Sequence, residues 1–184
     1  MKKAKKISLA AILSALSVVC MALGAFIQVV DLTAVALASV LVIFARIELG
    51  PPYEWLVYGV SGTLSLMLMI GVNPVIPAVY LSFAGMYPIL KAYFEQRTRK
   101  VAWICKSVYF FVISAVLLAG AYVVSVYVLG IPFFEGWLAP YATPLLIGLY
   151  VLAVIVCYLY DILLSSLIVL YMARLRPKIA STLK

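Results

Sequence analysis

The basic residues of this chain fall into four short groups that long apolar segments separate. These groups lie at the N-terminus, after the second apolar segment, in the run Lys91–Lys106 and near the C-terminus. Charged side chains between apolar spans stay in water, and Lys and Arg favour the cytoplasmic side of a membrane. The pattern therefore predicts a chain that crosses a membrane several times, with the run Lys91–Lys106 as a cytoplasmic loop.

The apolar content of the chain supports this prediction. Hydrophobic residues make up 67% of the 184 residues, against roughly 45–50% in soluble domains. A net charge of +8 would suggest nucleic acid in a soluble protein, but here topology and anionic lipid account for the basic residues. We therefore expect an all-α integral membrane protein that contacts the lipid bilayer and no nucleic acid.

Turn and breaker residues divide the chain into six predicted transmembrane helices within a single domain. Asp31 is expected to cap a short second helix, the prolines of residues 71–77 to end the third, and Pro88 to kink the fourth. The first apolar stretch, of about 20 residues, is long enough to be a retained span rather than a signal peptide. The predicted spans are residues 7–27, 32–45, 54–70, 78–93, 101–129 and 145–173.

The basic residues also predict the orientation of these six spans. On this count all 14 Lys and Arg lie on one side, and the connections 28–31, 71–77 and 130–144 on the other side contain none. Both termini are therefore expected in the cytoplasm, in a multi-pass protein of the cell membrane.

The chain contains no histidine, which removes the commonest general base and the commonest metal ligand. Its three cysteines, Cys20, Cys105 and Cys157, are scattered and have no metal-ligand spacing. We therefore expect no metal, no cofactor and no catalytic residue, and the chain is not expected to be an enzyme.

Asp161 lies about 12 residues before the cytoplasmic end of the last predicted span, hence roughly 18 Å deep at 1.5 Å per residue. A carboxylate at that depth is expensive and usually faces a cavity, a partner or a ligand. The alternative is an acid that only pins helix packing. Both interpretations stay open at this point.

The predicted outer side concentrates aromatic and polar residues. An interfacial aromatic belt would explain each of them singly, whereas a long loop stiffened by prolines is typical of a pocket wall. Asn73 and Tyr80 lie at the outer end of the third and fourth spans, where such residues more often cap turns. The candidate substrate-binding residues are Asn73, Tyr80, Glu135, Trp137, Tyr141, Tyr150 and Asp161.

Small residues recur on one face of the first predicted span. Ala11 and Ala15 are four residues apart, and Ser8 and Ala22 lie roughly on the same face. Such a flat stripe lets another helix approach closely. It predicts either packing within the chain or docking of a partner subunit.

These features together resemble the substrate-binding S component of energy-coupling-factor (ECF) vitamin transporters. The resemblance rests on about 180 residues in six spans, the Ala11-xxx-Ala15 face, and a short second helix entered through Asp31-Leu-Thr and left through Glu48-Leu-Gly50. It implies capture of a vitamin or related nutrient at the outer face. It also implies a partner membrane subunit with two cytoplasmic ATPases, docked on Ala11 and Ala15.

The charge distribution limits the chemical class of the expected ligand. With no Lys, Arg or His on the predicted outer side, we expect a neutral or cationic aromatic molecule, held by ring stacking and one acid. Two alternatives to this nutrient-uptake function remain. One is a non-transporting membrane scaffold or assembly protein, and the other is a small proton-coupled transporter that uses Asp161.

Overall fold

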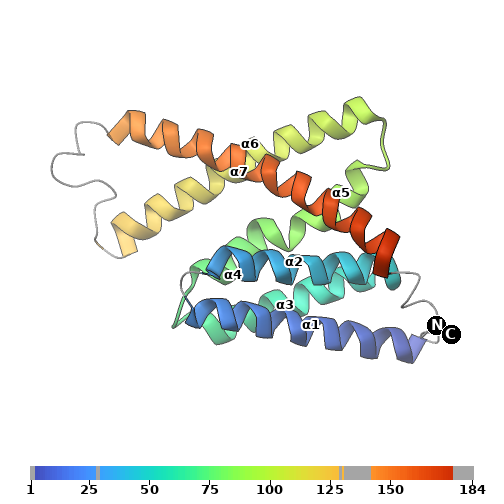
Figure 1. Cartoon of the computed structure of the whole chain (residues 1–184). Coiled ribbons are helices and arrows are strands. Elements are labelled where there is room, and N and C mark those ends of the chain that lie inside the picture. Colours follow the sequence, from blue (N-terminus) through green and yellow to red (C-terminus); the bar gives the residue numbers. More distant parts are fainter. Residues whose placement is uncertain (1–2, 28–29, 129, 131–141, 176–184) are drawn as a thin grey trace. The chain divides into compact units, whose positions relative to one another are not determined.

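The computed structural model describes residues 3–27, 30–128, 130 and 142–175, and every regular element within them is a helix (Figure 1). The prediction of an all-α chain is therefore confirmed for these residues. The chain forms two compact units, residues 1–102 and 103–184. The single six-helix domain stays a prediction.

The first unit is a helical bundle in which α1 packs against both α2 and α3 (Figure 1). The face of α1 that enters the bundle carries small residues such as Ala10, Ser14 and Ser17, and both serine hydroxyls donate to carbonyls of their own helix. Small side chains let helix backbones approach closely in an apolar environment. The elements are α1 (Lys3–Phe26), α2 (Asp31–Glu48), α3 (Tyr53–Met69), α4 (Val75–Val79), the π-helical turn η2 (Tyr80–Ala84) and α5 (Met86–Phe94).

Gly24 lies where α1 meets α2, and this contact leads to a prediction about stability. A Cβ atom at residue 24 would lie 2.5 Å from the Cβ of Ala34, which cannot rotate away. Gly24→Ala is therefore expected to destabilise the protein by about 1–3 kcal/mol, seen as a lower Tm in detergent. Gly59→Ala is the matched control, because beyond its chain neighbours and its own helix backbone no described atom lies within 4 Å of its Cβ position. Equal losses in both variants would contradict this packing.

The basic residues of the first unit gather at one end of the bundle. Lys6 donates to the carbonyl of Leu49 at 3.2 Å, which places the start of α1 beside the end of α2. Arg46 lies 4.9 Å from the ring centre of Tyr93, which brings the end of α5 to the same place. The opposite end carries Asp31 and Asn73.

The second unit consists of two long helices that cross (Figure 1). The ring of Phe110, which is fully buried, meets the ring of Tyr158 edge-on at 5.0 Å between centroids. The hydroxyl of Ser114 lies 3.7 Å from the sulfur of Cys157 at the same crossing. The elements are α6 (Arg99–Val123), the π-helical turn η3 (Val124–Val128), α7 (Ala142–Leu170) and the π-helical turn η5 (Tyr171–Leu175).

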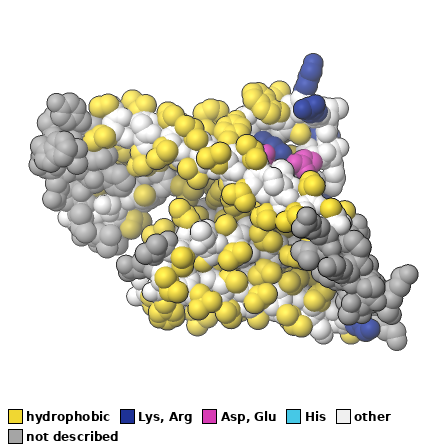
Figure 2. Space-filling view, in the orientation of Figure 1, with side chains coloured by type: hydrophobic (Ala, Val, Ile, Leu, Met, Phe, Trp, Pro, Cys, Tyr) yellow, Lys and Arg dark blue, Asp and Glu magenta, His cyan; other side chains and the backbone are white. Residues whose placement is uncertain are grey.

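Four helices of the described part are long and apolar enough to cross a membrane, namely Lys3–Phe26, Val75–Phe94, Arg99–Val126 and Ala142–Ala173. Figure 2 shows hydrophobic side chains over most of the coloured surface on the face drawn. The helices α2 and α3 are not among these four. The helix α3 has 17 residues, and the 18 residues of α2 include three charged ones. The prediction of membrane-crossing helices is thus confirmed for their length and composition, and the count of six stays a prediction.

The second helix differs from its prediction in length and in its cap. It spans Asp31–Glu48, 18 residues instead of about 14, because Arg46 is neutralised by Glu54 and the helix continues past it. Asp31 is the first helical residue and not the cap, a position that Val30 holds without a side-chain hydrogen bond. The prediction of a capping role for Asp31 was therefore wrong.

The prolines act partly as predicted, because α3 ends at Met69, before the turn that contains Pro74. Pro77 does not end a helix but lies in the first turn of α4, where its missing N–H is not needed. The irregularity expected at Pro88 lies one turn earlier, in η2, where the N–H of Gly85 donates to the carbonyl of Tyr80 at 2.8 Å. A Cβ at Gly85 would come within 2.8 Å of two tyrosine rings, so this close approach requires glycine.

The connection between the fourth and fifth predicted spans lies close to where the spans 78–93 and 101–129 place it, although the whole run Lys91–Lys106 was described as a cytoplasmic loop. Only residues 95–98 lie outside helices, because α5 continues to Phe94 and α6 begins at Arg99. Lys91 therefore lies inside α5, buried and 3.7 Å from Glu95, while Lys106 lies two turns inside α6. Lys91 pairs with Glu95 within one helical turn, whereas Lys106 pairs with Asp161 of α7.

Candidate functional site

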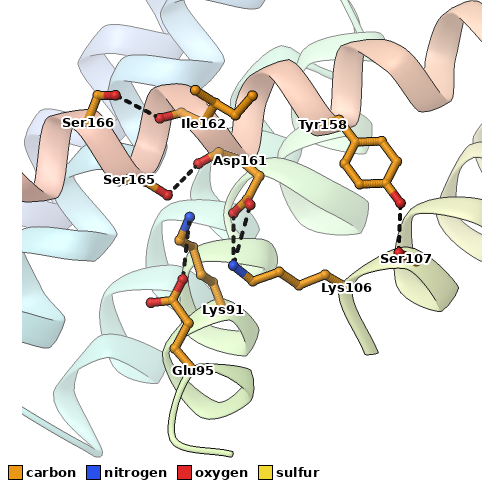
Figure 3. A network of polar contacts seen from close by, with 9 residues as sticks. All are labelled: Lys91, Glu95, Lys106, Ser107, Tyr158, Asp161, Ile162, Ser165 and Ser166. Carbon is orange, nitrogen blue, oxygen red and sulfur yellow. Dashed lines mark hydrogen bonds and ion pairs between the residues drawn. The ribbon is translucent and has the colours of Figure 1, made fainter. Parts of the chain in front are cut away.

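The main polar centre of the second unit is an ion pair between α6 and α7 (Figure 3). The ammonium of Lys106 lies 3.4 Å from each carboxylate oxygen of Asp161. One residue further along α6, the hydroxyl of Ser107 lies 2.7 Å from the hydroxyl of Tyr158. Opposite charges and hydroxyls therefore meet on the facing sides of two apolar helices.

Exposed apolar residues flank Asp161 in the sequence of α7. Leu159, Ile162 and Leu163 are each more than half exposed and lie beside Asp161 in sequence. A charge among such residues is expensive unless it is paired, and the lysine provides the counter-charge that the sequence analysis had not assigned. The pairing gives Asp161 a partner from a neighbouring helix.

Sequence analysis did not assign Lys106 as the partner of Asp161, because it grouped this residue with the basic run Lys91–Lys106 although the predicted span 101–129 already contained it. The apolar residues Val101, Ala102 and Ile104 before it were the available signal, since they already belong to α6. At 1.5 Å per residue, Lys106 lies about 10 Å along the helix from Arg99.

Tyr150 lies on the same side of α7 as Asp161, because eleven residues are close to three full helical turns. The two are about 16 Å apart along the axis, too far to contact one small ligand group together. The hydroxyl of Tyr150 donates to the carbonyl of Phe111 at 3.1 Å. The structure thus places both residues on the side of α7 that faces α6, at separate levels.

Asn73 and Tyr80 occupy two different places in the first unit. The amide of Asn73 donates to the carboxylate of Asp31 at 2.9 Å, and its carbonyl oxygen accepts from the N–H of Val75. Tyr80 is fully buried, and its hydroxyl lies 2.7 Å from that of Ser61. These contacts connect helices and do not bring the two residues into one site.

The predicted binding residues Glu135, Trp137 and Tyr141 lie outside the described residues, so the outer loop stays a prediction. Within the part that the structure describes, no three His, Cys, Asp or Glu side chains are grouped so as to hold a metal ion.

A second polar centre, which the sequence analysis did not find, lies in the first unit. Glu54 is fully buried at the start of α3 and forms an ion pair with Arg46 of α2. The hydroxyl of Tyr93 lies 3.5 Å from the same carboxylate oxygen, and the Tyr93 ring faces the guanidinium. No described residue donates to the other oxygen of Glu54. This centre joins three helices at the basic end of the bundle.

Ala11 and Ala15 are both exposed on α1. The buried face of this helix carries other residues, among them Ala10, Ser14 and Val18. The small-residue stripe is therefore not used for packing within the described part of the chain.

No protein-family model, curated protein or solved structure matches this chain.

Proposed function

We propose that this chain is a membrane-embedded substrate-binding subunit for uptake of a small vitamin-like nutrient, powered by a partner ATPase module. It is a multi-pass protein of the cell membrane with six spans and both termini in the cytoplasm. Its substrate is an aromatic molecule that is neutral or cationic. The partner is a coupling membrane subunit with two cytoplasmic ATPases.

The observation that carries this proposal is the exposed Ala11/Ala15 face of α1. A helix that buries one set of small residues inside its own bundle and exposes a second set can pack against two neighbours. The second neighbour is the coupling subunit, which the resemblance to ECF S components places on this face. Uptake depends on that contact because the chain has no GxxxxGK[ST] phosphate-binding loop.

The proposal predicts that a bulky residue on this face separates uptake from binding. Ala11→Trp is expected to reduce ATP-dependent nutrient uptake by roughly 10-fold or more, because the indole prevents close helix approach. Ligand binding by the purified chain should stay unchanged. The measurements are uptake in cells that express the coupling module and mass spectrometry of the small molecule that co-purifies.

Leu16→Trp is the matched control for this variant. Leu16 is 47% exposed and points away from the Ala11/Ala15 face, so it tests the effect of an added indole on the same helix. We expect little change in uptake. A loss of uptake in both variants, or in neither, would contradict docking on the alanine face.

A further inference from the structure

The connection from α5 to α6 carries three exposed basic side chains, those of Arg97, Arg99 and Lys100. We call these three residues the basic turn. The acid nearest to them in sequence, Glu95, pairs with Lys91 at 3.7 Å. Within the part of the chain that the structure describes, none of the three forms an ion pair. The positive charge of the basic turn is therefore available to a partner outside the chain.

The position of the basic turn makes this charge unfavourable by itself. Arg99 and Lys100 open α6, where the helix dipole is positive, and the first turn of this helix contains no acidic residue. Like charges within four residues also repel one another, although water and salt weaken the repulsion. An anion beside the basic turn would be stabilised by the same positive potential.

The residues that follow the basic turn on α6 are apolar and exposed. Val101, Trp103 and Ile104 are 44%, 65% and 55% exposed. Trp103 comes four residues after Arg99 and three after Lys100, so these three side chains share one face of the helix. A water-soluble acidic partner would match the charge but not the apolar side chains. Cations directly before exposed apolar residues and a tryptophan instead match the boundary between lipid headgroups and acyl chains.

We propose that the basic turn binds the headgroup of an anionic phospholipid. The guanidinium groups of Arg97 and Arg99 and the ammonium of Lys100 pair with the phosphate, and the acyl chains lie along Trp103 and Ile104. This inference depends on α6 lying in a membrane and goes beyond the proposed uptake function, on which it does not rest.

Energy transfer from Trp103 to a pyrene-labelled lipid tests this inference on the full chain. The other tryptophans, Trp55 and Trp137, are replaced by phenylalanine so that Trp103 is the only donor. The chain is reconstituted in phosphatidylcholine nanodiscs that contain a trace of pyrene-labelled phosphatidylglycerol or pyrene-labelled phosphatidylcholine. We expect the anionic lipid to associate at least about fivefold more strongly, the contribution of a single basic residue near an anionic membrane surface. Equal transfer to both lipids would overturn the inference.

Paired charge-neutral variants show whether the preference belongs to the basic turn. Arg99→Gln with Lys100→Gln should remove most of the preference for phosphatidylglycerol. Lys3→Gln with Lys5→Gln is the matched control, because it removes two other exposed lysines, at the start of α1, and should keep the preference. All four side chains are exposed, so both variants should fold. An equal loss in both variants, or a loss in neither, would contradict binding at the basic turn.

Inorganic phosphate distinguishes a lipid headgroup from a free anion at the same residues. Millimolar phosphate should lower the transfer no more than sodium chloride of equal ionic strength, because a free anion has no acyl chain to place beside Trp103. If phosphate displaced the labelled lipid more strongly than chloride, the basic turn would be a general anion site and the lipid assignment would be wrong.

Discussion

Replacing Arg46 with methionine is expected to lower the free energy of unfolding by roughly 3–5 kcal/mol. The variant leaves the carboxylate of Glu54 fully buried without its counter-charge. The hydroxyl of Tyr93, at 3.5 Å from that carboxylate, is too distant to replace a guanidinium. Denaturant unfolding of the purified chain in mild detergent, followed by tryptophan fluorescence, measures the loss.

The double variant Arg46→Met with Glu54→Met distinguishes the cost of one unpaired buried charge from the loss of the ion pair itself. It removes both charges and fills the space with apolar side chains, so it should recover most of the stability that the single variant loses. Arg97→Met controls for the loss of one positive charge at an exposed position and should change stability by less than about 0.5 kcal/mol. If the double variant were as unstable as the single one, the ion pair could not be the cause.

The positions of the helices could be predicted from the sequence because apolar segments and turn residues alternate along it. The third helix, predicted over residues 54–70, spans Tyr53–Met69, and the last, predicted over residues 145–173, spans Ala142–Leu170 followed by η5. The ends of these two helices depend on where the chain must return to water, and this is a local property of the sequence.

The partners of the charged residues could not be predicted in the same way. Arg46, Lys91 and Lys106 were placed at helix ends or in a loop because a lone charge is expected in water. Each lies inside a helix beside a carboxylate. Two of these carboxylates come from another helix, Glu54 for Arg46 and Asp161 for Lys106. A pairing over 55 residues, as between Lys106 and Asp161, leaves no periodic signal in a single sequence.

The surroundings of Tyr80 could not be predicted for a related reason. Tyr80 was expected near the outer end of its span because it follows a proline-rich turn. The helix α4 begins at Val75 and continues into η2, where Tyr80 is fully buried. Its hydroxyl partner, Ser61, is 19 residues away on α3. A helix start three residues earlier than predicted therefore brings Tyr80 into contact with α3, and its role in substrate binding stays a prediction.

Cysteine variants at the two ends of the first unit are expected to react from opposite sides of the membrane. Gln96→Cys, in the short turn after α5, lies at the basic end, whereas Val72→Cys lies in the turn after α3. In a background that lacks the native cysteines, a membrane-impermeant maleimide should label Val72→Cys in intact cells. Gln96→Cys should react only after the cells are permeabilised, because basic residues favour the cytoplasm.

A third position, Pro51→Cys, decides whether α2 and α3 cross the membrane. With six spans the turn between them is cytoplasmic, and with four spans, where this hairpin does not cross, it lies outside with residue 72. The contact of Lys6 with the carbonyl of Leu49 ties that turn to the start of α1, so we expect labelling only after permeabilisation. Labelling of Pro51→Cys in intact cells would reduce the number of spans and place the turn on the outer side. It would also remove the basis for assigning the outer end of the bundle to substrate entry.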